Sequence, residues 1–312
     1  MNKKSSNPPK RHHYVPQFFL RNFAVDPEKT KITALIKHGN RAVWKEQSIK
    51  SIAFEPELYV HRDGSAPLSF ETKINTDLED PISKTETWQK ISEGATDKLD
   101  RSDRAVLYSL VRNLAARTPH SRNTARELAV LASQPDNGMA FSDDEKEMYA
   151  ALRADPKLMS LMVMKMASSL AWTESEFSSC AISIWRVSNP VFVCSTPVHI
   201  MKSLNHPSLR ATQAGLDPHI YLMPLTSRAY VSVSLGDFDG AFTNHHVDPI
   251  VEAGLKRNIV AQFSYWPIVR HMICPADGLV EQMEWAGYDC ADDSPKKKTF
   301  LRNSNFREHQ SV

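Results

Sequence analysis

The chain has 312 residues and a mass of 35.3 kDa, enough for one large or two moderate domains with a sizeable core. Apolar residues make up 41% of it and charged residues 24%, which is typical of a globular protein and excludes fibrous or wholly disordered chains. No apolar run approaches the roughly 18–20 residues of a membrane span, and none follows the basic start of the chain, so we expect no membrane anchor and no secretory signal.

Cysteine spacing and charge distribution indicate the cellular compartment and the kind of binding partner. The four cysteines lie far apart without a Cys-x-x-Cys pair, which predicts reduced thiols in a cytoplasmic protein and neither a zinc nor a redox centre. The net charge is only +2, yet residues 1–50 carry eleven Lys and Arg against three Asp and Glu. A basic segment of this kind suits a polyanion such as nucleic acid, although terminal charges often form only a solvated tail.

The first quarter of the chain is predicted to be mainly extended. Residues 1–10 are predicted to form a flexible basic arm. An aromatic amphipathic segment follows over 13–23, with a short helix after Pro16. Segments 31–37 and 41–47 flank His38-Gly39-Asn40 and predict a β-hairpin, and 57–61 predict a third strand.

The middle of the chain is predicted to be helical. One helix is expected to begin near Ser69 and to be broken or kinked at Pro81, and a second to begin at a Ser102 cap and end at Pro119. A third begins at the capping box Ser142–Glu145. Further helices are predicted up to Leu131 and from Asp155-Pro156, the last one rich in methionines that we interpret as core.

Short β-type runs return from Cys180 onward. They cover residues 181–187, 191–194, 221–225 and 229–235, and Asp248-Pro249 then predicts the start of a late helix. The predicted fold class is therefore α+β: an N-terminal segment and β-hairpin, a central helical layer, and a C-terminal mainly antiparallel β region with a late helix. We expect a single domain over residues 11–290 and a polar, disordered tail over 291–312.

The familiar catalytic motifs are missing from the sequence. It contains no G-x-G-x-x-G, no G-x-x-x-x-G-K-[ST], no H-E-x-x-H and no G-x-S-x-G. These absences argue against a nucleoside triphosphatase, a dinucleotide oxidoreductase, a zincin and an α/β-hydrolase. They do not argue against a nuclease, because many nucleases use scattered histidine, arginine and acidic side chains.

One segment near the N-terminus carries an uncommon run of residues. It reads Arg11-His12-His13-Tyr14-Val15-Pro16-Gln17-Phe18-Phe19-Leu20-Arg21-Asn22-Phe23. This run resembles the opening signature of a bacterial family known as domain of unknown function 4238, His-His-Tyr-Val-Pro-x-Phe/Tyr-x-Leu-Arg-x-Phe. Weaker similarities follow in the family's order, over about residues 11–270, at Glu71 and Glu79, Arg117-Thr118-Pro119 with Arg122, Pro224-Leu225 and Asn258.

The resemblance has one departure and one functional implication. The family's Ser-Asp-x-Pro after a strand is replaced here by Cys194-Ser195-Thr196-Pro197, so no role of that acidic residue is carried over. The resemblance implies a protein of anti-phage defence whose chemistry is unassigned.

The candidate catalytic residues are His12, His13, Glu79 and Arg117. A neutral imidazole accepts a proton near pH 7, and adjacent histidines point to opposite sides of an extended chain, whereas in a helix both would line one rim. Glu79, or Glu71, is a candidate to orient the imidazole, and Arg117 to stabilise developing negative charge. The candidate substrate-binding residues are Arg11, Arg21, Arg122 and Asn258.

The same residues also fit a structural interpretation. His12 and His13 would then anchor the segment, and Arg21 would pair with Glu71 or Glu79 to hold it in place. The spacing His245-His246-x-Asp248-x-x-x-Glu252 resembles a metal site, but Asp248 before Pro249 is better explained as a helix cap. Ser195 would be a nucleophile only with a base beside it. We therefore predict no metal ligands, and leave cofactors undetermined.

Two functions of different classes follow. In the first, the protein is an intracellular anti-phage effector that cleaves or modifies nucleic acid with a His/Arg/Glu site. In the second, it is a sensor or binding protein without catalysis, whose partner is a phage component or nucleic acid. We expect no membrane partner, and the sequence leaves the oligomeric state open.

Overall fold

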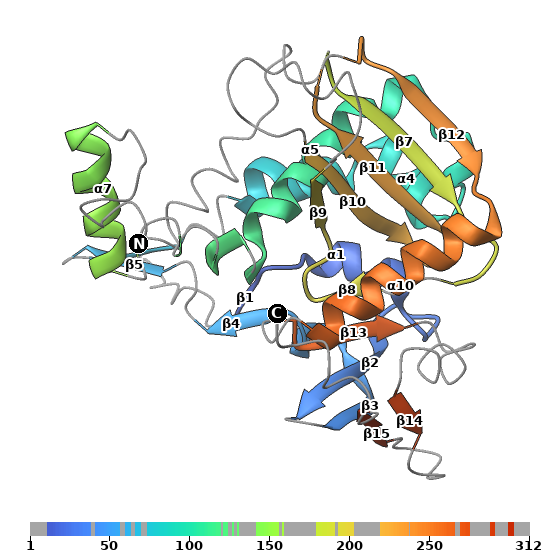
Figure 1. Ribbon diagram of the computed structural model, residues 1–312, viewed down its shortest axis with the longest axis horizontal. Helices are drawn as coiled ribbons and strands as arrows, with labels where there is room; N and C mark the ends of the chain where they lie inside the picture. The colour runs from blue at the N-terminus through green and yellow to red at the C-terminus, as the bar shows by residue number, and fades with distance from the viewer. Residues whose placement is uncertain are drawn as a thin grey trace, which may run out of the picture.

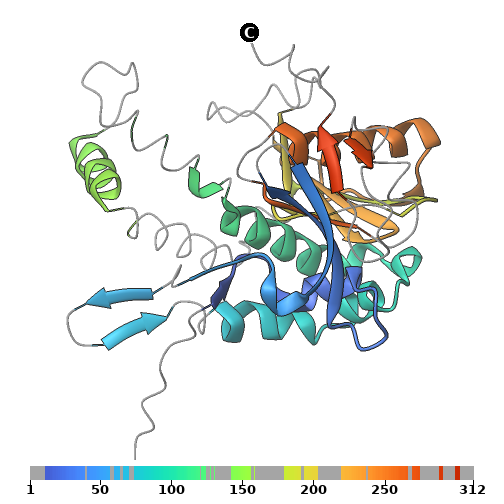
Figure 2. The same ribbon diagram turned by 90° about the horizontal axis from the view of Figure 1, so that it is seen from below.

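A computed structural model places most of the chain (Figures 1 and 2). It describes residues 11–38, 41–56, 60–63, 66–69, 74–119, 121–123, 127, 130, 142–155, 158, 179–190, 193–202, 219–236, 238–265, 269–274, 288–290 and 299–302. The predicted basic arm 1–10, Glu71 and the methionine-rich helix after Pro156 lie outside the described residues.

Most of the described helical residues lie between 75 and 154, with short turns near the N-terminus and α10 late in the chain. The α-helices are α1 (Gln17–Leu20), α3 (Asp80–Ser83), α4 (Glu86–Ser92), α5 (Arg104–Arg117), α7 (Asp143–Ala154) and α10 (Pro249–Tyr265). Shorter turns are the 3₁₀ turns η1 (Arg21–Phe23), η2 (Ile49–Ser51), η4 (Thr96–Lys98) and η5 (Arg101–Asp103), and the π-helical turn η3 (Asn75–Glu79).

The strands in the described residues form two large and two small sheets. The five-stranded sheet has the order β12 (Phe242–His246), β7 (Ala181–Arg186), β11 (Ala229–Ser234), β10 (His219–Thr226) and β9 (His199–Lys202). The six-stranded sheet has the order β14 (Tyr288–Cys290), β15 (Thr299–Arg302), β3 (Arg41–Ser48), β2 (Lys31–His38), β13 (His271–Cys274) and β8 (Val193–Cys194). The two-stranded sheets pair β1 (Arg11–His13) with β4 (Phe54–Pro56), and β5 (Val60–Asp63) with β6 (Ala66–Ser69).

The helices cover the two large sheets. Helices α4 and α5 pack on the five-stranded sheet, and α10 packs on β8 and β13 of the six-stranded sheet (Figure 1). Helix α7 and the β5–β6 pair lie on the same side of the molecule, away from the two large sheets, in both views (Figures 1 and 2). Every described strand pair is antiparallel except β7–β12, so the fold is α+β with a mainly antiparallel C-terminal half, as predicted.

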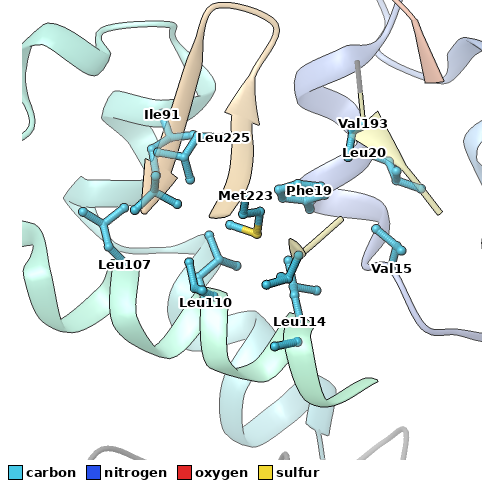
Figure 3. Close-up of a cluster of buried hydrophobic side chains, with 14 of the residues drawn as sticks. Val15, Phe19, Leu20, Ile91, Leu107, Leu110, Leu114, Val193, Met223 and Leu225 are labelled. Atoms are coloured by element: carbon cyan, nitrogen blue, oxygen red, sulfur yellow. The ribbon is translucent and has the colours of Figure 1, made fainter. Parts of the chain in front are cut away.

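The N-terminal segment is part of the core. Phe19 of α1 lies beside Met223 of β10 on the side that faces α5, and Leu20 lies beside Val193 of β8 (Figure 3). Phe19 is fully buried and Phe23 is 3% exposed, while Phe18 is partly buried against the core. The expectation that the aromatic segment packs against the helical layer is confirmed, and burial of each such ring is worth about 1.5–3 kcal/mol.

Several predicted boundaries are confirmed by hydrogen bonds. Strands β2 and β3 pair in register as the predicted hairpin. Ser142 and Glu145 form the predicted capping box of α7, and the Asp248 carboxylate accepts the Ile250 N–H at 2.7 Å at the start of α10. Helix α5 ends at Arg117, because Thr118, which precedes Pro119, is extended.

One predicted helix start is not described and one predicted cap was wrong. Ser69 ends strand β6, residues 70–73 lie outside the described part, and Ile74 is already helical, so the start of the helix expected near Ser69 is not described. The cap expected at Ser102 lies at Asp100, whose carboxylate accepts the Ser102 N–H at 2.7 Å, while Asp103 accepts the Asp100 N–H at 2.8 Å. A 3₁₀ turn therefore precedes α5, and the spacing of hydrophobic residues does not distinguish such a turn from the first turn of an α-helix.

Two predicted segments are described in part. Of the predicted strand 57–61, the structure describes Val60 and His61, which open β5, and the preceding residues lie outside the described part. Within the predicted tail 291–312, it describes Thr299–Arg302, which form β15 and pair with β3.

Asn244 links β12 to the residues before α5 through hydrogen bonds of its side chain. Its amide donates to the carbonyls of Thr96 and Leu99 at 2.9 Å each. We expect Asn244→Ala to lower the free energy of unfolding by about 1–2 kcal/mol, measured by urea denaturation, because two carbonyls lose their donor. Thr243→Ala, which removes an exposed hydroxyl bonded to Ser183, is the control and should cost less than about 0.5 kcal/mol. Equal effects would contradict the assignment.

Candidate functional site

The N-terminal segment has two faces that serve different purposes. In α1 and η1, Phe19, Leu20 and Phe23 are buried in the core. Four other residues of the same segment line a cavity: Gln17, Phe18, Arg21 and Asn22. Residues three and four apart share a helix face, so the spacing that buries Phe19, Leu20 and Phe23 also turns the four lining side chains toward the cavity.

His13 reaches the same cavity from strand β1. It lies opposite Phe54 of β4, and the two ring centroids are 5.8 Å apart. His13 is 8% exposed and lines the cavity, whereas His12, on the other side of the strand, is fully buried. The alternation of an extended chain therefore selects one histidine for the cavity.

Several groups around His13 set its pKa. Burial lowers the pKa of His13 below 6.5, and a hydrogen bond with the backbone of Lys50 acts in the opposite direction. The nearby charges of Arg117 and Arg11, and His12, lower the pKa of His13 further. The imidazole is therefore mostly neutral at pH 7, which is the form that accepts a proton.

Glu79 enters the cavity from an unusual helical turn. Asn75–Glu79 form a single π-helical turn immediately before Pro81, which lies in the first turn of α3. Pro81 has no N–H to donate and its ring crowds the preceding turn, which favours a wider turn at this position. The break or kink predicted at Pro81 corresponds in the structure to a π turn just before it. This turn brings Asn75, Glu79 and Asp80 to the cavity.

Arg117 joins three parts of the chain at the end of α5. Its guanidinium forms an ion pair with Glu79, donates to the carbonyl of His13 at 2.6 Å, and lies 3.5 Å from the amide oxygen of Asn113. The Arg117 side chain is 1% exposed and that of Glu79 15%. Arg117 therefore fixes the main chain at His13 relative to the π turn.

Lys29 comes to the cavity from the loop before β2. The Asp26 carboxylate accepts the N–H groups of Thr30 at 2.9 Å and Lys31 at 2.6 Å, and this turn holds Lys29 at φ 52°. Desolvation raises the pKa of Asp26, but the hydrogen bonds from the Thr30 hydroxyl and from the Lys31 and Thr30 N–H groups together outweigh it and lower this pKa to about 2. The Lys29 ammonium donates to the Ser92 carbonyl at 3.2 Å, so both the backbone and the ammonium group of Lys29 are held in place.

The cavity has a volume of about 590 Å³. Its wall combines one imidazole, both signs of charge, amides, hydroxyls and two aromatic rings. The described lining residues are His13, Pro16, Gln17, Phe18, Arg21, Asn22, Lys29, Asn75, Glu79, Asp80, Ser83, Trp88, Ser92 and Arg117.

The structure brings half of the predicted site residues together. His13, Arg21, Glu79 and Arg117 line the cavity. His12, Arg11, Arg122 and Asn258 are not among its described lining residues. The structural hypothesis that Arg21 pairs with Glu79 is not met, because Glu79 pairs with Arg117.

The other predicted residues lie elsewhere. Arg11 is exposed, with its guanidinium 5.0 Å from the centre of the Phe54 ring. Arg122 pairs with Glu55 and lies over the ring of Tyr14 at 5.8 Å. Asn258 is a half-buried residue of α10.

Ser195 lies behind the signature segment. It is 1% exposed, and its hydroxyl is a hydrogen-bond partner of the Tyr14 side chain. Burial, followed by the charge of Glu55, raises the pKa of Tyr14 to about 12. Ser195 is not among the described residues that line the cavity, and its contact with Tyr14 supports the packing of the segment.

Sequence reasoning missed Lys29, Trp88, Asn75 and Asp80 among the residues that line the cavity. Lys29 lies in an Asp-Pro-Glu-Lys-Thr turn, and Asp26 followed by Thr30 is a turn signal that could have flagged a fixed cation. Trp88 forms an edge-to-face pair with Phe18 at 4.6 Å, a contact between segments 70 residues apart that no local pattern indicates.

The His245–Glu252 spacing is a structural feature. His245 and His246 are exposed on β12, and Asp248 caps α10 as predicted. Glu252 is buried and accepts the N–H groups of Ser188 at 2.8 Å and Asn189 at 3.1 Å. Glu252 also pairs with Lys256 at 2.9 Å, so the carboxylate anchors α10 to the turn after β7.

Glu252 is expected to make stability depend on pH. Burial alone would raise its pKa, but Lys256 and the Asn189 and Ser188 groups outweigh it and lower the pKa of Glu252 below 4.5. Its stabilisation is therefore complete above pH 4.5 and lost as pH falls through the lowered value. We expect Glu252→Gln to cost about 1–3 kcal/mol at pH 7 and less near pH 3 in urea denaturation. A pH-independent cost would contradict this.

Metal and membrane features can be assessed in the part of the chain that the structure describes. Within it, no group of three or more His, Cys, Asp and Glu side chains is arranged to hold a metal ion. None of the described helices combines the length and the apolar character that crossing a bilayer requires.

Comparison with known proteins gives one match. No curated protein and no solved structure matches the chain. The sequence profile of a family described as "Protein of unknown function (DUF4238)" matches residues 11–237. That range contains every described residue that lines the cavity and ends before Asn258 and α10. Since the match covers more than half of the 312 residues, the chain belongs to the DUF4238 family.

Proposed function

We propose that the cavity is an active site for phosphodiester chemistry on nucleic acid, and that the protein acts inside the bacterial cell in anti-phage defence. The chemical part of this proposal is supported by one observation. Four side chains from distant segments of the chain line one cavity: His13, Arg21, Glu79 and Arg117. The defence role rests on the resemblance of the N-terminal signature. The basic balance of residues 1–50 supports a polyanionic substrate.

Each group has a role in the proposed hydrolysis. The neutral imidazole of His13 takes a proton from water while the water oxygen bonds to phosphorus. The bond from phosphorus to the leaving oxygen breaks, and that oxygen takes a proton from solvent. Arg21 and Lys29 stabilise the charge on the phosphoryl oxygens, and Arg117, bound to Glu79, holds His13 in place.

A second candidate function is binding without catalysis, as a sensor of a phage component or nucleic acid. It is favoured by one observation: the charges of Glu79 and Arg117 neutralise each other, and Arg117 is almost fully buried. In that case the cavity recognises a ligand, and its acid–base groups only maintain the fold.

Phage plating combined with nucleic-acid integrity distinguishes the two functions. Cells carrying the wild-type protein should resist phage and show degraded RNA or DNA during infection, whereas cells carrying His13→Gln should show neither. Full protection with intact nucleic acid in wild-type cells would contradict the nuclease proposal and favour the sensor. His246→Gln, an exposed histidine on β12, is the matched control and should behave as wild type.

A further inference from the structure

We propose that the cavity takes one unpaired nucleotide unit, with the base in the corner between Phe18 and Trp88 and the phosphate between Arg21 and Lys29. This inference rests on the proposed function and names the substrate class of the same site. It predicts that the protein prefers single-stranded nucleic acid, in RNA or DNA, over a duplex of the same sequence.

The aromatic corner supplies the surface for a base. The rings of Phe18 and Trp88 lie 4.6 Å apart at an interplanar angle of 78°, and both line the cavity. In this edge-to-face pair one ring already packs on the other, and Trp88 is 6% exposed, so Phe18, which is only partly buried, presents most of the ring surface that a third flat ring can reach. Every nucleobase has a π face, so stacking at such a corner is tolerant of sequence.

The charges of the cavity separate into a neutral part and a cationic part. Arg117 is compensated by Glu79, so this pair offers little net charge to a ligand. Arg21 is exposed, and among the described residues no carboxylate lies within ion-pair distance of it. Lys29 is held by the Ser92 carbonyl, which is neutral. Asp80 also lines the cavity, so the described lining carries three cations against two carboxylates, and Arg21 and Lys29 leave a net positive charge there for a phosphate.

The size of the cavity sets the unit that it can take. A volume of about 590 Å³ lies within the range of pockets that enclose one small molecule. A base within a duplex has both faces covered by its neighbours, so it must be unpaired and unstacked before an aromatic corner can receive it. A base in a single strand is already unpaired, so its binding does not require the free energy of opening a base pair.

Equilibrium binding of labelled oligonucleotides tests the inference. The probes are single strands of about twelve nucleotides, in RNA and in DNA, and the blunt duplex of the same sequence. Using His13→Gln to prevent turnover, we expect the single strands to bind at least about tenfold more tightly than the duplex. Equal affinity for the duplex would overturn the inference.

Two pairs of variants test the named groups. Phe18→Leu should weaken single-strand binding by about 5- to 150-fold, whereas Phe19→Leu, in the core on the same helix, should lower stability but not the affinity of folded protein. Lys29→Gln should reduce the salt slope of binding by about 0.7, and Lys31→Gln, outside the cavity, should preserve the preference for single strands. Indistinguishable effects within either pair would also overturn it.

Cleavage assays separate this inference from the proposed function. If the wild-type protein cleaves duplex and single strand at equal rates, the nuclease proposal stands and the unpaired-nucleotide site fails. If single strands bind in a Phe18-dependent manner and no cleavage occurs, the site stands and the nuclease proposal fails.

Discussion

Replacing His13 with glutamine is expected to slow phosphodiester cleavage by about 10²–10⁴-fold while leaving the fold nearly intact. A general base contributes rate enhancement of this size. Glutamine retains hydrogen-bonding groups near the Lys50 backbone, so the free energy of unfolding should fall by less than about 1.5 kcal/mol. Single-turnover cleavage and urea denaturation, measured on the same preparation, check both parts.

The opposite pattern would contradict a catalytic role for His13. A large fall in stability with a proportional loss of activity would identify a structural histidine. His246→Gln, on the exposed edge strand, should leave both the rate and the stability unchanged.

Replacing Arg117 with methionine is expected to lower the free energy of unfolding by about 3–5 kcal/mol. Arg117 is 1% exposed, and its loss would leave the largely buried carboxylate of Glu79 without its counter-charge and the His13 carbonyl without this donor. Urea denaturation of Arg117→Met measures the effect. The surface pair Lys146–Asp143 is the control, and Lys146→Met should cost less than about 1 kcal/mol.

A double variant tests whether the cost comes from the unpaired carboxylate. When Glu79→Gln is added to Arg117→Met, part of the lost stability should return, because no buried charge remains. Additive losses would show that Arg117 stabilises the protein mainly through its contacts with His13 and Asn113.

The cavity assigns different tasks to the predicted catalytic residues. His13 faces the cavity with a lowered pKa, which suits a base, whereas Arg117 acts through the His13 backbone and is a positioning residue. His12 belongs to the buried side of β1, opposite Glu55 in the β1–β4 register. The two adjacent histidines thus have separate environments.

Local patterns predicted the parts of the structure that local physics determines. The spacing in the segment from His13 to Phe23 predicted buried aromatics, and Ser142, Pro119 and Asp248 predicted helix ends through capping or the missing proline N–H. Each of these features depends on residues within a few positions along the chain.

The remaining features depend on long-range pairing. Strand β4 forms because its backbone meets β1, more than 40 residues away, and nothing in Phe54–Pro56 alone indicates a strand. The cavity likewise needs Arg117, 104 residues from His13, and the π turn that Pro81 favours but does not specify. Sequence could name His13, Glu79 and Arg117 as candidates, but only packing shows that Arg117 binds both of the others.

The pH dependence of single-strand cleavage by the wild-type protein tests the central claim most directly. Because burial and nearby positive charge lower the pKa of His13 below 6.5, the base stays neutral at pH 7 and becomes protonated only at more acidic pH. We predict a rate that is constant around neutral pH and falls tenfold per pH unit below the lowered pKa, with no such acid limb in His13→Gln. A rate that rises as pH falls below 6.5, or an oligonucleotide that stays intact at every pH, would contradict the account.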